Sequence, residues 1–500
     1  MIEVLSVKNM RESDAHTIAG GVSGRELMYR AGVGILESVS WKEPVAIVCG
    51  SGNNGGDGYV LATLLHERGV SCALFSLSDR FSEDGRYYSD LCTERGIPRV
   101  TCGADTDFSG YRTVVDCIFG TGFRGDAEGL ARSVIEAINK AGEMGAYVVS
   151  VDINSGMNGD NGRCAVAVRS DLTVSIGCRK SGHFLGSAKD YIKRLVNCDI
   201  GILPIEKPYG LYEASDVKAA LGVRKNDSNK STYGYVALVG GSEYYSGAIR
   251  LSSLAESAMR SGAGVTTVAA PKSLSHVILP AILESTFFPL SEENGFFKFD
   301  SDEFDRLTRR VKVVAFGMGI GLSDEAERAV SYLLTQYTGR LVLDADGLNA
   351  LAKLPRQLLC ESAATVVLTP HPLEFARLAG LTVDEVLNDP IGRARGYARE
   401  TGAIVLLKGS TTVVTDGEEV ILVDRGCAGM ATAGSGDVLS GILAALLGYV
   451  SDPLSAVASA AYLNGRAGEL AEAENGTIPM TAGDTARKVK NAVTEVVREA

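Results

Sequence analysis

The 500-residue sequence predicts an α/β protein of two domains, each built on a mainly parallel sheet. Three observations predict this class. Short β-branched runs alternate with longer amphipathic stretches, which is typical of a parallel sheet covered by helices. Glycine-rich or acidic segments follow many of these runs, at the place where parallel sheets bind their ligands. The alternation breaks once, over residues 204–232, which we interpret as the connection between the domains.

Composition narrows the class of protein. Hydrophobic residues make up 45% and charged residues 22%, which indicates a soluble globular protein. The 49 basic and 61 acidic residues give a net charge of −12 with no Lys/Arg-rich run, so no nucleic-acid partner is expected. The absence of a leader-like segment and of an apolar run of about 20 residues predicts a cytoplasmic protein without a membrane partner. Ten scattered cysteines form no CxxC pair, so we expect reduced and mostly buried thiols.

Apolar runs predict the strands of the first domain at residues 45–49, 72–77, 114–119, 147–151 and 172–176. Helical patterns over residues 57–68 and 127–141 lie between these runs. The repeated strand–helix order predicts parallel neighbours joined by crossover helices.

A glycine motif follows the first of these strands. Gly50, Gly52 and Gly55 have the GxGxxG spacing of a dinucleotide fingerprint, although a tight turn would use the same glycines. Asp79 stands near the position where a Rossmann enzyme carries an acid, so a hydride-transfer enzyme stays open as an alternative. A P-loop is excluded because no Lys-Ser/Thr pair follows the glycines.

Acidic and amide side chains follow the same strands. Asn53, Asn54 and Asp57 bring oxygens to the start of a helix, where such groups suit a hard cation and where backbone N–H groups favour phosphate. Asp116 ends the third predicted strand and Asp152 the fourth, and each is followed by glycines. Helix capping explains one such residue, but three together indicate one shared site.

Four motifs of the first domain resemble the epimerase domain of NAD(P)H-hydrate repair enzymes: GNNGGDG (52–58), VDCIFGTGFRG (115–125), VDINSG (151–156) and CRKSGH (178–183). The resemblance implies interconversion of the R and S forms of hydrated nicotinamide cofactors. It implies that the dinucleotide is held by Asn53, Asn54, Gly55, Gly56, Asp57, Thr121, Gly122, Phe123, Arg124 and Gly125. It also implies that Asn54, Asp116 and Ser155 bind K⁺. Asp152 would contact the reacting ring with Lys180 as its partner, since a carboxylate and an amine can shuttle a proton. Asn154 stands where the family usually has proline.

The second domain shows the same alternation. Apolar runs predict strands at residues 235–239, 265–269, 311–316, 341–343, 365–368, 403–407 and 411–414. The sequence Gly434-Ser435-Gly436-Asp437 precedes an apolar helix over residues 438–447, so its N–H groups can hold an anion. Asp437 then suits a base that deprotonates a hydroxyl, although a helix-start role is the alternative.

Other strand ends of this domain carry groups that suit a nucleotide. Lys408 and the hydroxyls after it offer a cation and donors to phosphate, with a hairpin turn and a surface lysine as the alternative. Asp344 and Asp346 end a strand but receive no role. His371 lies between prolines at a strand end, where a ligand contact and a structural role are equally open.

Seven motifs of the second domain look like the dehydratase of the same repair system: GGSEYYSGA (240–248), SGAGVTTVA (261–269), GMGIG (317–321), LDADGLNAL (343–351), TPHPLEF (369–375), LKGSTT (407–412) and GMATAGSGDVLSG (429–441). The resemblance implies a ribokinase-like fold and dehydration of the S-hydrate driven by ADP or ATP. It places the hydrate at Ala263, Gly319, His371 and Asp437, and the adenine nucleotide at Lys408, Gly409, Ser410, Thr411, Thr412 and Gly436. Mg²⁺ is expected with the phosphates, without assigned ligands. Cys427-Ala428 and Asn464 depart from the usual Asn-Pro and His.

These observations lead to one hypothesis with two alternatives. We expect a Rossmann-like three-layer epimerase domain over residues 1–210 and a ribokinase-like dehydratase domain over residues 220–500, fused as isomerase and lyase for metabolite repair. NAD(P)H hydrates and an adenine nucleotide are the expected partners, and a homo-oligomer is expected. The alternatives are a vitamin-precursor kinase with a non-catalytic first domain, and a regulatory dinucleotide-binding protein without catalysis.

Overall fold

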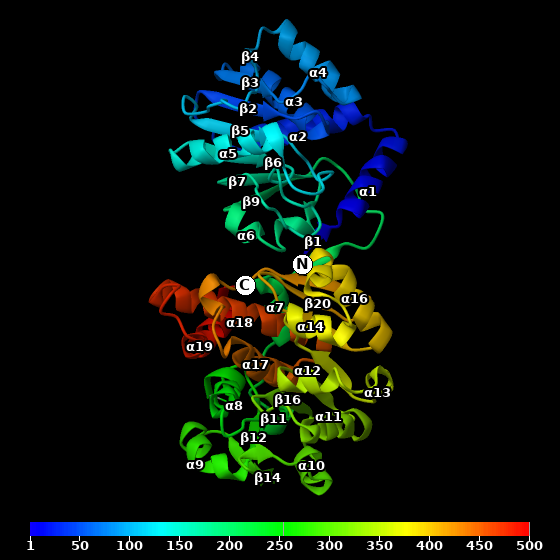
Figure 1. Cartoon of the computed structure of the whole chain (residues 1–500), viewed down its shortest axis with the longest axis vertical. Coiled ribbons are helices and arrows are strands. Elements are labelled where there is room, and N and C mark those ends of the chain that lie inside the picture. Colours follow the sequence, from blue (N-terminus) through cyan, green and yellow to red (C-terminus); the bar gives the residue numbers. More distant parts are fainter. Residues whose placement is uncertain (254, 500) are drawn as a thin grey trace. The chain divides into compact units, whose positions relative to one another are not determined.

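The computed structural model describes residues 1–253 and 255–499 and divides into two compact units (Figure 1). The N-terminal unit comprises Glu3–Tyr209, and the C-terminal unit comprises the chain from Gly210 onward together with Met1 and Ile2. Both units are α/β structures, which confirms the predicted fold class.

The N-terminal unit contains one sheet of seven parallel strands. In spatial order these are β4 (Arg99–Thr101), β3 (Cys72–Ser76), β2 (Val45–Cys49), β5 (Thr113–Cys117), β6 (Tyr147–Val151), β7 (Leu172–Ile176) and β9 (Leu195–Cys198). The five predicted strands are therefore present, each within two residues of its expected ends. The short edge strands β4 and β9 were not predicted because three or four residues leave little periodicity to detect.

Helices cover both faces of this sheet, as the three-layer prediction requires (Figure 1). Val45 and Ile47 of β2 pack with α2, α3 and α4, whereas Ala46 and Val48 pack with α5. This alternation follows from side chains that point to opposite faces along a strand. The helices are α1 (Val7–Ala19), α2 (Gly24–Ser38), α3 (Asn53–Glu67), α4 (Glu83–Glu94), α5 (Gly129–Glu143) and α6 (Ala188–Tyr191). The short β1 (Ile2–Leu5) pairs in parallel with β8 (Arg179–Lys180), which runs into the turn η1 (Ser181–His183).

The segment at residues 204–232 is only partly a connection. From β10 (Tyr209–Leu211) onward it belongs to the C-terminal unit, where β10 pairs with β21 and is followed by α7 (Ala214–Leu221). Tyr212 and Val217 are buried in the core of that unit. The boundary between the two units falls within this segment, between Tyr209 and Gly210, but β10 and α7 were not predicted because a strand and a helix this short leave no clear periodic signal.

The C-terminal unit contains a sheet that is parallel from β13 to β19 and antiparallel at the β19–β20 and β20–β21 pairs. In spatial order its strands are β13 (Thr286–Leu290), β12 (Val265–Pro271), β11 (Tyr235–Gly240), β16 (Val313–Met318), β17 (Arg340–Leu343), β18 (Thr365–Leu368), β19 (Ile404–Leu407), β20 (Thr412–Thr415), β21 (Val420–Val423) and β10. A separate hairpin joins β14 (Glu292–Glu293) to β15 (Phe296–Phe297).

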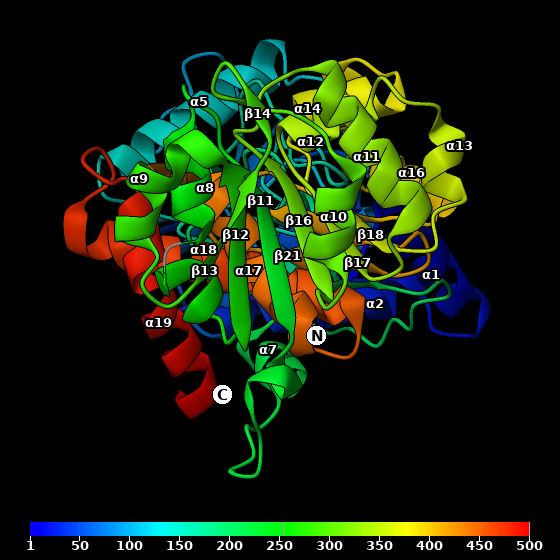
Figure 2. The ribbon, with the colours of Figure 1, turned by 90° about the horizontal axis from the view of Figure 1, so that it is seen from below.

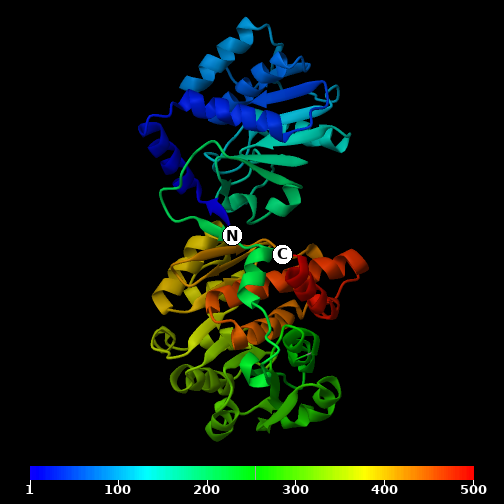
Figure 3. The same cartoon turned by 180° about the vertical axis from the view of Figure 1, so that it is seen from behind.

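The main core of this unit lies between the sheet and α8 (Ser246–Ser253), α17 (Ser435–Tyr449), α18 (Pro453–Asn475) and α19 (Ala482–Glu499). Helix α17 is apolar on nearly all sides because it is buried between the strands and α18. Figure 2 shows the strands with the helices grouped about them, and Figure 3 shows α18 and α19 lying against each other. The remaining helices are α9 (Ser275–Ile278), α10 (Ser301–Thr308), α11 (Asp324–Gln336), α12 (Asp346–Leu351), α13 (Arg356–Cys360), α14 (Pro372–Ala379), α15 (Val383–Asn388) and α16 (Pro390–Thr401).

The order of the strands in each sheet indicates where its candidate site lies. In the N-terminal unit, β3 and β4 lie on one side of β2, and the strands from β5 onward lie on the other side. The point at which the strand order reverses therefore lies between β2 and β5. In the C-terminal unit the corresponding point lies between β11 and β16. Ligands of open α/β sheets bind outside the carboxyl ends of the strands at such points. No helix among the described residues has the length and apolar character that a membrane crossing requires.

Candidate active sites

A buried ion pair lies at the carboxyl edge of the N-terminal sheet. Asp152 follows β6 and Lys180 ends β8, and Lys180 Nζ lies 2.5 Å from Asp152 Oδ1. The Lys180 side chain is 1% exposed and that of Asp152 is 14% exposed, so the carboxylate is the member of the pair that faces outward. Burial alone would raise the pKa of Asp152, but the charge of Lys180 holds this pKa below its usual value. Asp152 is therefore ionised at neutral pH.

Two segments that the sequence assigned to the dinucleotide site lie close to Asp152. Its Oδ2 accepts the backbone N–H of Thr121 at 3.0 Å. Gly120, just before Thr121, has no free space: a Cβ there would lie 3.0 Å from Asp152 Oδ2 and 3.4 Å from the Cβ of Asn54. Asp57, one turn after Asn54 on α3, is buried, and burial and the charge of Asp152 raise its pKa well above the usual value. The site therefore combines a carboxylate whose pKa is lowered, Asp152, with a carboxyl group whose pKa is raised, Asp57.

A second cluster brings Asn54, Asp116 and Ser155 together. Asp116 Oδ1 accepts the Ser155 hydroxyl at 2.5 Å, and its Oδ2 accepts the Ser155 N–H at 2.9 Å. Ser155 Oγ accepts the N–H of Phe119, and the Phe119 carbonyl accepts the Asn54 side-chain N–H, at 2.8 and 2.9 Å. Ser150 also donates to Asp116. Asp116 is fully buried without a cationic partner among the described residues, and burial raises its pKa.

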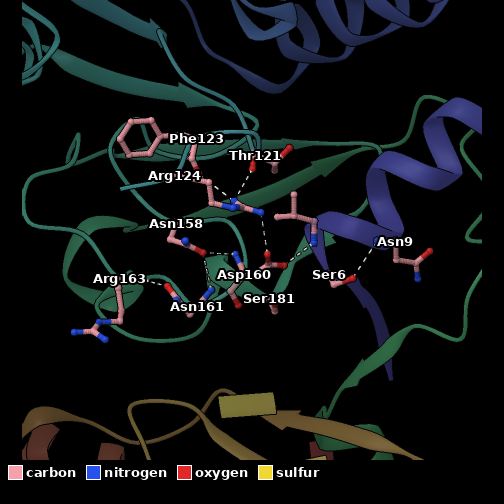
Figure 4. Close-up of polar contacts among 11 residues, drawn as sticks. Ser6, Asn9, Thr121, Phe123, Arg124, Asn158, Asp160, Asn161, Arg163 and Ser181 are labelled. Atoms are coloured by element: carbon pink, nitrogen blue, oxygen red, sulfur yellow. Dashed lines mark hydrogen bonds and ion pairs between the residues drawn. The ribbon is translucent and has the colours of Figure 1, made fainter. Parts of the chain in front are cut away.

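The loop of Thr121–Gly125 is organised by Arg124 (Figure 4). The guanidinium donates to the carbonyls of Thr121 and Phe123 at 3.2 and 3.0 Å and forms an ion pair with Asp160 at 3.2 Å. Asp160 also accepts the N–H of Val7 at the start of α1, at 2.7 Å. Arg124 therefore shapes its own loop. The sequence analysis missed Asp160, for which the only signal was an acid within the polar segment of residues 158–163.

The C-terminal unit has its own charged cluster. Lys408 lies in the turn between the antiparallel strands β19 and β20, so the hairpin alternative is correct, but the lysine is not a surface residue. Lys408 Nζ lies 3.1 Å from Asp344 Oδ1 and 3.9 Å from Glu374 Oε2. Ser440 of α17 donates to the other oxygen of Asp344 at 2.7 Å. Burial would raise the pKa of Asp344, but Lys408 and Ser440 hold it below the usual value.

Asp437 belongs to the same cluster. It lies in the first turn of α17, and burial together with the charge of Asp344 raises its pKa to about 7. A Cβ at the neighbouring Gly436 would lie 3.5 Å from Lys408 Nζ and 3.7 Å from Asp344 Oδ2. The first turn of α17 therefore faces the ion pair of Lys408 and Asp344.

Comparison with known proteins decides the family. Residues 236–491 match the family model described as NAD(P)H-hydrate dehydratase, and residues 24–182 match that of the YjeF-related protein N-terminus. The bifunctional NAD(P)H-hydrate repair enzyme Nnr of Moorella thermoacetica is 36% identical over 92% of this chain and 90% of its own. The enzyme of the same name from Pyrobaculum aerophilum is 34% identical over 95% of this chain and 94% of its own.

The chain belongs to the bifunctional NAD(P)H-hydrate repair enzyme family. Each of the two family models falls within one structural unit. A ribokinase-like superfamily protein of Enterococcus faecalis superposes on 59% of this chain and 99% of its own with a TM-score of 0.50 at 24% identity. That likeness shows the predicted ribokinase-like fold.

Within this repair enzyme, the structure gathers most of the predicted dehydratase residues but not all. Gly319 follows β16 at the carboxyl edge, with Tyr245 and Ala248 beside it. Ala263 is buried just before β12, at the amino edge of the same parallel sheet, so it is not near the others. Its position speaks against the hydrate contact that the motif implied. The alanine beside Gly319 is Ala248, which lies in another of the motifs.

His371 of the repair enzyme has a structural role. Its Nδ1 accepts the N–H groups of Leu373 and Glu374 at 3.2 and 3.3 Å, so it caps α14. Its side chain is 47% exposed, and its Nε2 lies 3.5 Å from Glu374 Oε2. Of the turn residues, Gly409 and Ser410 are exposed, Thr411 donates to Asp424 at 2.8 Å, and Thr412 begins β20. Sequence reasoning assigned no role to Asp344, which directly follows β17, or to Glu374, which lies in the first turn of α14.

The oxygen atoms around Asn54 are candidates for binding one of the two expected cations, K⁺. Oδ1 of Asn54 is buried without a hydrogen-bond partner, and it lies in the cluster with Asp116 and Ser155. Orphaned oxygens of this kind fit a hard monovalent cation such as K⁺. Among the described residues, no three His, Cys, Asp or Glu side chains form a metal-binding group.

Proposed function

We propose that the two units act in sequence on hydrated nicotinamide cofactors. Residues 1–210 would interconvert the R and S hydrates, and residues 220–500 would dehydrate the S form with ADP or ATP. The observation that carries this proposal is a carboxylate with a shifted pKa at the carboxyl edge of each sheet: Asp152 in one unit and Asp437 in the other. Membership of the hydrate repair family favours dehydration over the formation of a stable phosphorylated vitamin.

In the epimerase site, the pKa values of two carboxyl groups are shifted in opposite directions. The hydroxyl must leave the ring carbon with a proton, and water must return to the other face and lose one. Asp57, whose pKa is raised, would donate a proton, and Asp152, whose pKa is lowered, would accept one or stabilise the ring cation between the two steps. Lys180 lies behind Asp152 and keeps it ionised, so it acts through the carboxylate.

The first turns of α3, Asn53–Asp57, and the loop of Thr121–Gly125 flank Asp152 and would hold the dinucleotide. Asn54, Asp116 and Ser155 would hold K⁺. A bound cation would neutralise the buried charge of Asp116 and add positive potential beside the phosphates. The orphaned oxygen of Asn54 and the buried carboxylate of Asp116 support this assignment.

In the dehydratase site, Asp437 would take the proton of the ring hydroxyl. Its pKa of about 7 matches the pH at which a general base works best. The oxygen of the ring hydroxyl would attack the terminal phosphorus of the nucleotide, and the rest of the nucleotide would leave as AMP or ADP. Lys408 and the first N–H groups of α17, which include that of Gly436, would hold the transferring phosphoryl group.

Phosphorylation converts a poor leaving group into a good one. The carbon–oxygen bond then breaks, phosphate leaves with the bonding electrons as the ring nitrogen donates its pair, and a proton leaves the neighbouring carbon to restore NAD(P)H. Mg²⁺ bound to the nucleotide would neutralise phosphate charge. Gly319, His371 and Asp437 would contact the hydrate, and Lys408–Thr412 the adenine nucleotide.

The test is phosphate release with purified S-NADH hydrate and either ADP or ATP. We expect release that requires the hydrate and equals the NADH formed. The Asp437→Asn variant should form no NADH. A stable phosphorylated product without NADH would instead support a small-molecule kinase.

A further inference from the structure

We propose that His183 is a positioning residue of the epimerase site: its imidazole joins the main chains of Asp152 and Lys180 and so fixes the ion pair that these side chains form. The proposal rests on the proposed epimerase function. The motif that contains His183 was recognised in the sequence, but no role was assigned to this residue.

One imidazole makes both contacts. His183 is 4% exposed and ends the turn η1, directly after β8. Its Nδ1 accepts the backbone N–H of Lys180 at 3.0 Å, and its Nε2 lies 2.7 Å from the carbonyl oxygen of Asp152. A ring nitrogen that accepts an N–H carries no proton, so Nε2 carries the hydrogen and donates it to Asp152.

The imidazole is a fixed neutral group. Burial and the neighbouring charge of Lys180 lower the pKa of His183 to about 3. Both ring nitrogens are occupied by backbone groups. His183 therefore has no free atom for proton exchange with a substrate, which leaves a positional role.

Asp152 needs such support. Its φ is +66°, a conformation that residues with a side chain rarely adopt and that must be enforced by their surroundings. Three contacts enforce it: the carbonyl accepts from His183, the carboxylate accepts from Thr121, and the N–H donates to Val174 at 2.8 Å. The conformation turns the carboxylate outward at the strand end while Lys180 stays behind it.

The turn that carries His183 is itself anchored. Ser181 donates its hydroxyl to the carbonyl of Asp160 at 2.8 Å, as Figure 4 shows. The Gly182 N–H donates to the carbonyl of Gly159 at 2.9 Å. A Cβ at Gly182 would lie 2.3 Å from the Asn158 carbonyl oxygen, so this close approach requires glycine. Because Asp160 also binds Arg124, the same segment supports the imidazole and the predicted dinucleotide loop.

Three substitutions separate the two hydrogen bonds. His183→Leu removes both. His183→Gln can place an amide N–H near the position of Nε2 and keep the donor to Asp152, whereas His183→Asn can keep only the acceptor for Lys180. The exposed His66→Gln serves as the matched control. Epimerisation of R-NADH hydrate is measured for each as kcat and KM across pH 5.5–9, using the full chain.

We expect His183→Leu to lower the epimerase kcat about 100-fold, since a shift of about 1 Å in a catalytic group has that effect, with KM within threefold of wild type. His183→Gln should recover to within about tenfold of wild type with an unchanged pH profile, and His183→Asn should recover less. Dehydration of pure S-hydrate by the same preparations should match wild type. Tm and circular dichroism report folding, and His183→Gln decides the outcome if His183→Leu does not fold.

An unchanged kcat in His183→Leu would overturn the inference. Loss of an ionisation from the pH profile in His183→Gln would also overturn it, because His183 would then be an acid or base. A wild-type chain without epimerase activity would instead refute the proposed function.

Discussion

Lys408 and Asp344, which are 64 residues apart in the sequence, form the central ion pair of the C-terminal site, with Nζ 3.1 Å from Oδ1. The pair joins the β19–β20 turn to the end of β17. It also sets the charge that acts on Asp437, because Asp344 raises the pKa of that residue and Lys408 lowers it. Under the proposed function, nucleotide binding by Lys408 and the base strength of Asp437 are therefore linked through one contact.

Removing Lys408 should destabilise the C-terminal unit. Lys408→Met leaves the buried carboxylate of Asp344 unpaired, which costs about 2–4 kcal/mol in the free energy of unfolding. The double variant Lys408→Met/Asp344→Asn should recover part of this loss. Lys353→Met is the matched control, since Lys353 is exposed and its ion pair with Glu327 contributes little to stability. Urea unfolding measures all four proteins, and equal losses for Lys408→Met and Lys353→Met would contradict the assignment.

Dehydration should depend on pH through Asp437. The base acts when ionised, so kcat/KM should rise tenfold per pH unit below about 7 and level off above it. Asp344→Asn removes the charge that raises this pKa, so the rise should move to lower pH. The measurement is kcat/KM for S-hydrate from pH 5 to 9, and a flat profile over this range would exclude Asp437 as the base.

The raised pKa of Asp437 also predicts that replacing this residue with Asn stabilises the folded protein. Because the folded protein disfavours ionised Asp437, this residue reduces stability as the pH rises from about 4 through 7. Asp437→Asn should therefore raise the free energy of unfolding by about 1–3 kcal/mol at pH 8, with little difference at pH 4. Thermal unfolding of both proteins at the two pH values tests this. A lower Tm of the variant at pH 8 would contradict it.

Gly120 should be required for epimerisation. In Gly120→Ala the new methyl group would lie against Asp152 Oδ2 and the Asn54 side chain, at 3.0 and 3.4 Å, and would displace one of them. We expect the epimerase kcat to fall about 10–100-fold with dehydratase activity intact. Gly110→Ala, where no atom lies within 4 Å of the new Cβ, is the control. Equal epimerase activity in both variants would show that the site tolerates this displacement.

Potassium should stabilise the N-terminal unit. The orphaned Oδ1 of Asn54 and the carboxylate of Asp116 gain a partner when K⁺ binds, so Tm should increase with KCl more than with LiCl at equal ionic strength. Asn54→Ala should remove the difference between the two salts. Identical Tm values for wild type in KCl and LiCl would refute the K⁺ assignment.

Strand–helix alternation was enough to predict the α/β class and the central strands, because buried parallel strands are apolar runs of typical length. Individual loop residues such as Asp152 and Lys408 were also identified, since each follows a strand. Their partners were harder to find. The contacts of Lys408 with Asp344 and Glu374, and those of His183 with Asp152, depend on strand order, which local patterns do not contain.

Ala263 shows a second limit. Its motif was correctly associated with a strand, but the alanine precedes that strand, so it lies at the edge opposite to Gly319. A motif gives the position of a residue along the chain, whereas the residues of one site must lie at the same end of the parallel strands. Ala248, at the start of a helix after β11, meets that requirement and lies beside Gly319.

The most direct measurement follows NADH absorbance from a mixture of R and S hydrates with excess nucleotide and Mg²⁺. We expect wild type to recover all the NADH in the rapid phase. Asp152→Asn, whose new residue tolerates positive φ, should rapidly recover only the S share, and Asp437→Asn should recover none. Complete rapid recovery by Asp152→Asn, or any enzymatic recovery by Asp437→Asn, would contradict the assignment of one reaction to each unit.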